Sequence, residues 1–141
     1  MKFWDSSAIV PMLVPERESS ACYGLLEDDP EMLVWATTSV EVLSAIHRMS
    51  RTGDLQPDAA ALAIEQLEVL RAGWSEVLDV EIVRTRAERL LAVHDLRAAD
   101  ALQLAAALTA SGERTRGVGF VGLDKRLNEA ARREGFRVLP D

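Results

Sequence analysis

The chain has 141 residues, 48% of them hydrophobic and 28% charged, which excludes an intrinsically disordered chain and predicts a single folded domain over residues 1–141. Its net charge of −7, from 23 acids and 16 bases, argues against a surface that attracts nucleic acid everywhere, although a local group of arginines can still hold phosphates. No apolar run approaches the roughly 20 residues of a membrane span and the one cysteine, Cys22, forms no internal disulfide, so we expect a cytoplasmic protein with a buried, inert thiol.

Short apolar stretches alternate with longer stretches in which apolar residues recur at helical spacing. In chain order they predict a strand at 2–5, helices at 6–14 and 17–28, a strand at 32–36, helices at 37–53 and 56–73, a strand at 75–80, helices at 81–95 and 97–111, a strand at 116–123, a helix at 124–135 and a strand at 137–140. Ser6 or Ser7 can cap the first helix, and Pro57 fits the first turn of a later one. Gly53 and Gly112 fit helix ends.

This alternation predicts an α/β fold with a parallel sheet covered by helices on both faces. Sites in such sheets lie outside the carboxyl ends of the strands. Asp5 stands at the end of the first strand, Glu41 lies just past the second, and Asp124 follows the strand at 116–123. We therefore expect three acids from distant parts of the chain to meet at one edge of the sheet.

A fourth acid, Asp100, lies in the apolar stretch "LRAADALQLAAAL". A helix that is apolar all round is buried, and a buried carboxylate without a partner is destabilising or takes up a proton. Arg97 on the same helix can offset the charge by an ion pair. A divalent cation shared with Asp5 is the alternative.

Each of the other three acids also has a purely structural explanation. Asp124 opens a predicted helix and can cap it through its side chain. Glu41 stands three residues after Thr38, which is the spacing of a capping box. Asp5 can cap the helix that follows it. Convergence of all four requires a cation among them, because the carboxylates repel one another.

Oxygen ligands alone favour Mg²⁺ or Mn²⁺ over zinc. His47 and His94 have no cysteine or second histidine at ligand spacing, and we interpret both as surface or packing residues. The chain contains no Ser-His-Asp arrangement, P-loop or dinucleotide-binding glycine motif. Metal-ion chemistry is the chemistry that remains.

Four segments in order, "FWDSSAIV", "TTSVEVLSAI", "LRAADALQLAAAL" and "FVGLDKRLNEAARREG", resemble the acidic motifs of PIN-domain proteins. The whole chain is similar to the VapC proteins of that family, the toxin ribonucleases of toxin–antitoxin modules. The resemblance implies a three-layer α/β/α domain with a central parallel sheet and a pocket that binds Mg²⁺ or Mn²⁺. By motif matching, Asp5 and Asp100 are the main metal ligands, and Glu41 and Asp124 complete the catalytic set.

Two further details follow from this resemblance. Ser6 takes the place of the hydroxyl residue that usually follows the first acid. Gly122 stands where the family often has Thr or Ser two residues before the last acid, Asp124, and departs from the family pattern there.

The resemblance also implies the reaction and the partners. We expect a metal-dependent endoribonuclease that hydrolyses single-stranded or looped RNA and leaves 5′-phosphate and 3′-hydroxyl ends. A VapB-like antitoxin is expected to occupy a groove, and the toxin is expected to form a homodimer. The apolar face of residues 59–70 has two interpretations, since it can cover the core or form part of this groove. The candidate phosphate contacts are Lys125, Arg126, Arg114 and Arg116, and the alternative for each is a solvated surface charge.

Other functions stay open at this point. One alternative is a PIN-fold nuclease that processes RNA without being a toxin, and another is a catalytically silent binding module that keeps its acids for structure. A phosphoaspartyl enzyme or receiver domain also places an aspartate after its first strand. The haloacid-dehalogenase type needs a second Asp where Ser7 stands, and Lys125 is misplaced for the lysine of a receiver domain.

Overall fold

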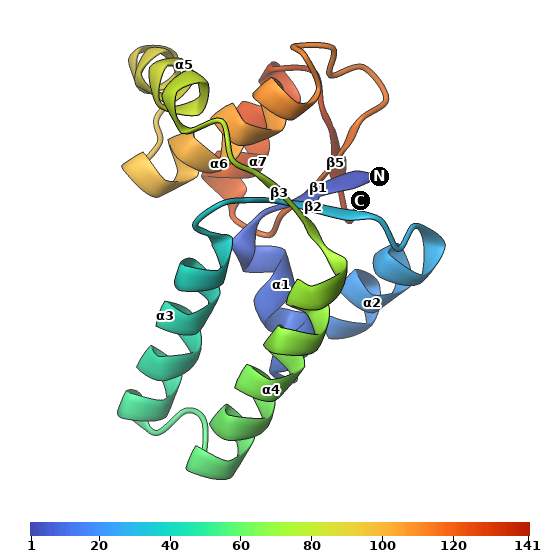
Figure 1. The fold of residues 1–141 in the computed structure, drawn as a ribbon, viewed down its shortest axis with the longest axis vertical. Coiled ribbons are helices and arrows are strands. Elements are labelled where there is room, and N and C mark those ends of the chain that lie inside the picture. The colour runs from blue at the N-terminus through green and yellow to red at the C-terminus, as the bar shows by residue number, and fades with distance from the viewer.

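The computed structural model describes all 141 residues and contains five strands and seven helices (Figure 1). The strands are β1 (Lys2–Trp4), β2 (Met32–Trp35), β3 (Ser75–Val77), β4 (Gly119–Val121) and β5 (Arg137–Leu139). The helices are α1 (Ser6–Leu13), α2 (Ser19–Asp28), α3 (Thr38–Thr52), α4 (Pro57–Gly73), α5 (Val80–Val93), α6 (Ala98–Ala110) and α7 (Lys125–Arg133). Every predicted element is present and has the predicted type.

The strands form one sheet in the order β3-β2-β1-β4-β5, and every neighbouring pair is parallel. The predicted parallel sheet is therefore confirmed. The N-terminal strand occupies the centre, where Phe3 pairs in register with Leu33 on one side and with Phe120 on the other. Because all strands run the same way, the residues that follow β1, β2 and β4 emerge at one edge.

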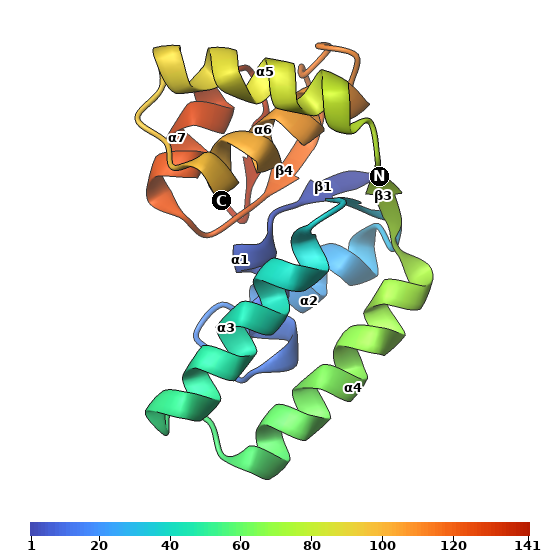
Figure 2. The same ribbon diagram turned by 60° about the vertical axis from the view of Figure 1, so that its left-hand side comes forward.

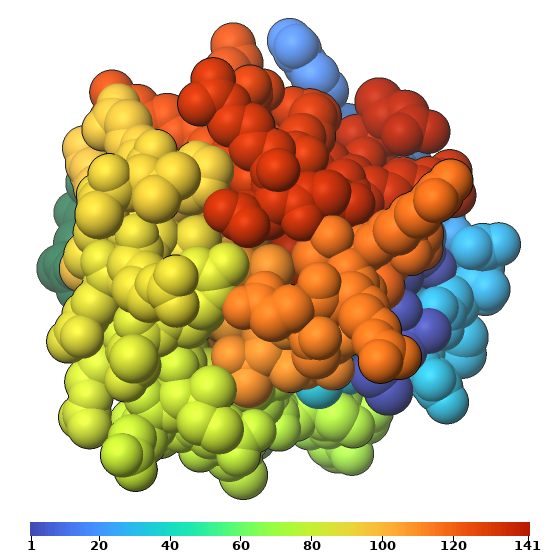
Figure 3. Space-filling view, turned by 90° about the horizontal axis from the view of Figure 1, so that it is seen from above, coloured from blue at the N-terminus to red at the C-terminus, as the bar shows by residue number.

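Side chains alternate between the two faces of the sheet and fill two separate cores. Trp4 packs with residues of α1, α2, α3 and α4, whereas its neighbour Phe3 packs with residues of α5, α6 and α7. The predicted three-layer α/β/α arrangement is confirmed, with four helices below the sheet and three above it in Figure 1. Figure 3 shows the second layer from outside, with α5 and α7 beside the segment that leads from α6 to β4.

Some boundaries differ from the prediction. Asp5, and not Ser6 or Ser7, is the N-cap of α1, because its carboxylate accepts from the backbone N–H of Ser7 at 3.1 Å. The strand predicted from residue 116 begins only at Gly119, since the chain is still turning at Gly117, which has a φ of 81°.

Helices α3 and α4 project from the sheet as an antiparallel pair (Figure 2). Along the apolar face predicted for 59–70, Ala60, Ala63 and Leu67 are buried in the core, as one of the two interpretations requires. Leu62 and Val69 point outward and are 54% and 76% exposed. None of the helices combines the length and the apolar character that a membrane crossing requires.

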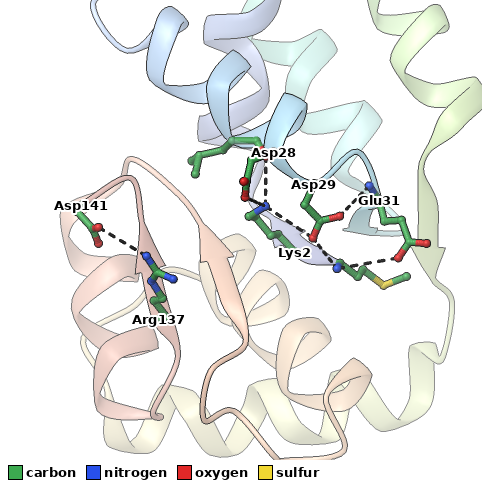
Figure 4. A network of polar contacts seen from close by, with 8 residues as sticks. Lys2, Asp28, Asp29, Glu31, Arg137 and Asp141 are labelled. Carbon is green, nitrogen blue, oxygen red and sulfur yellow. Dashed lines mark hydrogen bonds and ion pairs between the residues drawn. The ribbon is translucent and has the colours of Figure 1, made fainter.

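The amino ends of the strands carry a network of ion pairs (Figure 4). The Lys2 ammonium lies 3.3 Å from a carboxylate oxygen of Asp28 and 3.6 Å from one of Asp29. The N-terminal amino group of Met1 lies 2.6 Å from Asp29. The hydrogen bond from this amino group, together with the charge of Lys2, lowers the pKa of Asp29. Acids at this edge therefore have cationic partners.

Candidate active site

A pocket of about 1010 Å³ opens at the opposite edge, beyond the carboxyl ends of the strands. Its walls come from α1, α3, the start of α6 and the loop between β4 and α7. The lining residues are Ser6, Ser7, Val10, Val40, Glu41, Ser44, Ala45, Arg48, Arg97, Ala99, Asp100, Leu123, Asp124, Lys125 and Arg126. Three of the four predicted site acids line this pocket, and the fourth, Asp5, is buried next to its lining residue Ser6.

Asp5 is the most buried of the four acids, with 3% of its surface exposed. Its backbone N–H donates to the carbonyl of Val121 at 2.9 Å, which fixes it between the ends of β1 and β4. The pKa of Asp5 is raised to about 6, chiefly by burial and also by the negative charges of Glu41 and Asp100, while hydrogen bonds from Ser7 act in the opposite direction. The Asp5 carboxylate thus interacts electrostatically with two other predicted site acids, Glu41 and Asp100.

Two neighbouring serines connect Asp5 and Glu41 to the rest of the pocket. The Ser7 hydroxyl donates to the Asp5 carboxylate and accepts from the backbone N–H of Leu123 at 2.9 Å. The Ser6 hydroxyl, predicted to be the site hydroxyl, donates to Glu41 Oε2 at 2.9 Å. Ser6 therefore serves the second acid, and Ser7 serves the first.

Glu41 lies in the first turn of α3 and is held by side chains from three parts of the chain. Besides Ser6, Thr37 Oγ1 donates to its Oε1 at 3.3 Å, and the Gln103 amide nitrogen lies 3.2 Å from each of its oxygens. The N-cap of α3 is Thr37, not Thr38, and no side chain caps the helix. The capping-box explanation for Glu41 is wrong, because its carboxylate accepts from side chains and not from a backbone N–H of the helix start.

Asp100 lies in the first turn of α6 and is half-buried. The expectation that it would be surrounded by apolar side chains is wrong, because Asp100 lines the pocket, whereas the next residue, Ala101, is buried in the core. Burial raises the pKa of Asp100, and the charges of Asp124 and Glu41 add to the effect. The nearby charge of Arg97 lowers this pKa, but the two side chains form no ion pair.

Asp124 is exposed and is the N-cap of α7, since its Oδ1 accepts from the backbone N–H of Leu127 at 2.9 Å. The capping interpretation is therefore confirmed for this residue. The same carboxylate lines the pocket and raises the pKa of Asp100. Capping occupies one of its oxygens, and no protein group donates to the other.

Gly122, which departs from the family pattern, has a side-chain amide packed against it. A Cβ added at Gly122 would lie 2.7 Å from Asn128 Oδ1 and 3.6 Å from Cβ of Asp5. Asn128 also donates to the carbonyl of Gly122 at 2.8 Å. A Thr or Ser at this position would therefore have to displace the amide of Asn128.

None of the four acids forms an ion pair, although cationic side chains line the same pocket. These cations are Arg48, Arg97, Lys125 and Arg126. Arg126 lies 3.6 Å from Asp95, and the other three have no carboxylate within ion-pair distance. The pocket thus combines unpaired carboxylates with a cationic rim.

The other two predicted phosphate contacts do not belong to this rim. Arg114 borders a small cavity with Met1 and Leu33, at the amino edge of the sheet, and Arg116 lies in the turn before β4. Their assignment is wrong, because residues that precede a strand of this parallel sheet lie at the edge opposite to the pocket.

The donor set fits a hard divalent cation, since carboxylate oxygens are its preferred ligands and no histidine or cysteine lines the pocket as a competing ligand. No three His, Cys, Asp or Glu side chains are grouped closely enough to hold a metal ion as they stand. His47 is exposed and His94 bonds to Glu134 at 2.7 Å, which confirms that they are surface and packing residues. Cys22 is buried, and burial raises its pKa to about 11.

Several side chains of the pocket were not predicted from the sequence. Ser7, Arg48, Gln103 and Asn128 all contact it or its acids. A signal exists for Gln103, because it is the one polar residue within the apolar run "ALQLAAAL" and lies three residues after Asp100. The others lie among ordinary polar residues and carry no such signal.

The comparisons with known proteins agree with this geometry. The family model described as PIN domain matches residues 2–133. Ribonuclease VapC45 of Mycobacterium tuberculosis is 32% identical over 146 aligned positions, which cover 98% of this chain and 94% of that protein.

Solved structures of low sequence identity share the fold. The crystal structure of FitAcB from Neisseria gonorrhoeae superposes with a TM-score of 0.69 at 16% identity, covering 99% of this chain and 97% of that chain. A toxin–antitoxin complex from Klebsiella pneumoniae superposes with a TM-score of 0.62 at 16% identity, covering 89% of each chain. The match over residues 2–133 and the identity along nearly the whole length show that this chain belongs to the PIN domain family.

Proposed function

We propose that this chain is a metal-dependent endoribonuclease and the toxin of a VapBC-type toxin–antitoxin module. The observation that carries the proposal is the set of four carboxylates that gather at one pocket without a single ion pair, while bases line its rim. A 32% identical relative bears the name ribonuclease, which supports the same activity here. We assign the activity to the whole chain, residues 1–141, as one PIN domain.

Asp5 and Asp100 are the side chains we assign to holding the metal ion, Mg²⁺ or Mn²⁺. Burial and the charges of other acids raise the pKa of both, so a cation between them relieves repulsion that no ion pair of the protein neutralises. When bound, such an ion lowers the pKa of a coordinated water and stabilises negative charge on a phosphoryl oxygen. Hydrogen bonds from Ser7 occupy one carboxylate oxygen of Asp5, which leaves the other oxygen free to bind a metal ion.

Glu41 and Asp124 complete the negative floor of the pocket. Hydrogen bonds fix the orientation of both carboxylates, from Ser6 to Glu41 and from the amide of Leu127 to Asp124. Fixed carboxylates lose little freedom when a substrate or a hydrated ion binds between them. We assign them to orienting the water that attacks phosphorus.

The rim supplies the charge that RNA requires. Arg48 lies on α3, Arg97 precedes α6, and Lys125 begins α7, so the three cations surround the acids from three sides. Phosphates on either side of the cleaved bond can contact this rim while the scissile phosphate faces the acids. A protein of net charge −7 binds an anionic substrate through such a local arrangement.

Neutral substitution tests the activity. We expect Asp5→Asn and Asp100→Asn each to lower the rate of RNA cleavage by roughly 10³-fold, because metal-ion charge stabilisation contributes several kcal/mol. Asp28→Asn, which removes an acid from the amino edge, is the matched control and should cleave at the wild-type rate. Cleavage of labelled RNA by purified protein with Mg²⁺, with Mn²⁺ and with a chelator measures the effect. Activity that survives both pocket substitutions, or that ignores the chelator, would falsify the proposal.

The partners follow from the same proposal. A VapB-like antitoxin should bind the toxin and inhibit it, as the solved toxin–antitoxin complex of the same fold suggests, and the toxin should form a homodimer. Growth arrest on expression in the cytoplasm of a host cell, relieved by the protein encoded next to this gene, distinguishes a toxin from an RNA-processing nuclease. Absence of both growth arrest and binding by that neighbour would contradict the toxin role.

A further inference from the structure

A buried glutamine joins the two helices that carry Glu41 and Asp100. Gln103 is 0% exposed, and its amide nitrogen lies 3.2 Å from each oxygen of Glu41 and 3.1 Å from Thr38 Oγ1. It lies on α6 three residues after Asp100, so the two side chains share one face of that helix. Gln103 therefore links the helix of Asp100 to the carboxylate of Glu41.

The donors to Glu41 differ in what they can fix. Ser6 and Thr37 each contact a single oxygen through a hydroxyl, which rotates and which water can replace. Gln103 contacts both oxygens from a position that water does not reach. A movement of the Glu41 carboxylate away from α6 would lengthen both of these contacts.

The environment of Gln103 shows that its amide is not required for packing. It stands among fully buried apolar residues such as Leu104 and Ala106, and its own Oε1 receives no hydrogen bond. A buried carbonyl without a donor is destabilising, and an apolar side chain of the same length would fill this space without that penalty. The amide gains its contacts only on the side of Thr38 and Glu41.

We propose that Gln103 is a positioning residue, which holds the Glu41 carboxylate in a fixed orientation relative to Asp100 without touching the RNA. This inference rests on the proposed function and deepens it. The amide of Gln103 has two N–H groups, of which one donates to Glu41 and the other to Thr38. Because Gln103 and Asp100 lie on the same helix, α6, these contacts hold Glu41 in place relative to Asp100. Loss of the amide leaves Asp100 in place and frees the carboxylate of Glu41 to move away from α6.

Kinetics of two matched variants test the role. Gln103→Met keeps the length of the side chain and removes the amide, and we expect kcat for RNA cleavage to fall roughly 10- to 100-fold with little change in KM. Thr38→Val removes the other acceptor of the same amide and leaves both contacts with Glu41, so its kcat should stay within about twofold of wild type. Equal losses of kcat in the two variants would overturn the proposal, because a general disturbance of the core would then explain both.

A double variant shows whether Gln103 acts through Glu41. In a Glu41→Gln background, Gln103→Met should lower kcat no further, since the carboxylate that it positions is already gone. An undiminished loss in that background would overturn the proposed route.

A measurement without metal or RNA keeps the inference independent of catalysis. The side-chain amide of Gln103 should give nuclear magnetic resonance signals that exchange slowly with solvent and that shift in Glu41→Gln. Signals that do not respond to this substitution would overturn the link between the two residues. Responsive signals in a wild-type protein that cleaves no RNA would keep the link and overturn the proposed ribonuclease.

Discussion

The two edges of the β-sheet both carry acids, but only one edge neutralises them. At the amino edge, Lys2 lies within 4 Å of both Asp28 and Asp29, and the N-terminal amino group lies within 4 Å of Asp29 (Figure 4). At the carboxyl edge, Asp5 and Asp100 have no cationic partner, although arginines line the same pocket. An aspartate side chain is therefore stabilised by ion pairs at the amino edge, whereas at the carboxyl edge it is destabilised by burial and by the charges of other acids.

The difference separates structural acids from a site. An ion pair lowers the pKa of Asp29, whereas burial and like charges raise the pKa of Asp5 and Asp100. A fold gains nothing from gathering carboxylates that repel one another, unless a cation binds among them. Acids with raised pKa values at the carboxyl ends of parallel strands thus mark the functional edge.

The acids of the two edges should change the stability of the folded protein in opposite directions as pH rises, and this should be the largest effect. Asp5 binds its proton more tightly in the folded than in the unfolded chain, so its contribution to stability is complete below its ordinary pKa of 3.8 and is lost as pH rises through about 6. Without metal, Asp5→Asn should therefore gain stability over wild type between pH 4 and pH 7, by at most about 3 kcal/mol. Urea unfolding with a chelator at both pH values measures this gain. A difference in free energy of unfolding between Asp5→Asn and wild type that stays constant with pH would contradict the raised pKa of Asp5.

For the lowered pKa of Asp29 the sign is reversed. Its contribution to stability is present above the ordinary pKa of 3.8 and is lost as pH falls through the lowered value. Asp29→Asn should therefore differ most from wild type at neutral pH, where it removes a favourable charge, and the two proteins should converge in acid. The same urea series measures this convergence.

Metal binding should give the next effect and should depend on one edge only. Mg²⁺ or Mn²⁺ at about 100 times its dissociation constant should stabilise the wild-type protein by about 2.7 kcal/mol. Asp5→Asn combined with Asp100→Asn should abolish this shift in melting temperature, whereas Asp28→Asn should leave it intact. Equal shifts in all three proteins would mean that the metal does not bind in the pocket.

Removal of the cation at the amino edge should give the smallest effect. Lys2→Met keeps most of the aliphatic packing and leaves Asp28 and Asp29 without their lysine, which should cost about 1 kcal/mol of stability because Asp28 is largely exposed. RNA cleavage should not change. Chemical unfolding and a cleavage assay on one preparation test both statements, and a loss of cleavage without a loss of stability would remove the distinction between the edges.

Most of the fold can be predicted from the sequence, because the spacing of the apolar residues and the positions of the turn residues indicate the same helices and strands along the chain. The edge to which Asp5, Glu41 and Asp124 belong follows from strand direction alone. The same rule places Arg114 and Arg116 at the opposite edge, and their assignment to the site overlooked it.

The details of the site depend on tertiary contacts that local patterns do not contain. Asp5, Ser6 and Ser7 are all favourable caps, and in the structure the cap is Asp5, whose backbone N–H donates to Val121 at the end of β4. The contact between Gln103 and Glu41 spans 62 residues, and no local signal specifies such a pairing.

The central place of β1 has a consequence for how the pocket assembles during folding. The backbone N–H of Asp5 donates to Val121, and the Asp5 carboxylate is linked through Ser7 to Leu123, which lies 116 residues after Ser7. The pocket therefore depends on contacts between segments that are far apart in the sequence. Until β4 has paired with β1, Asp5 lacks the neighbours that fix its place beside the other acids.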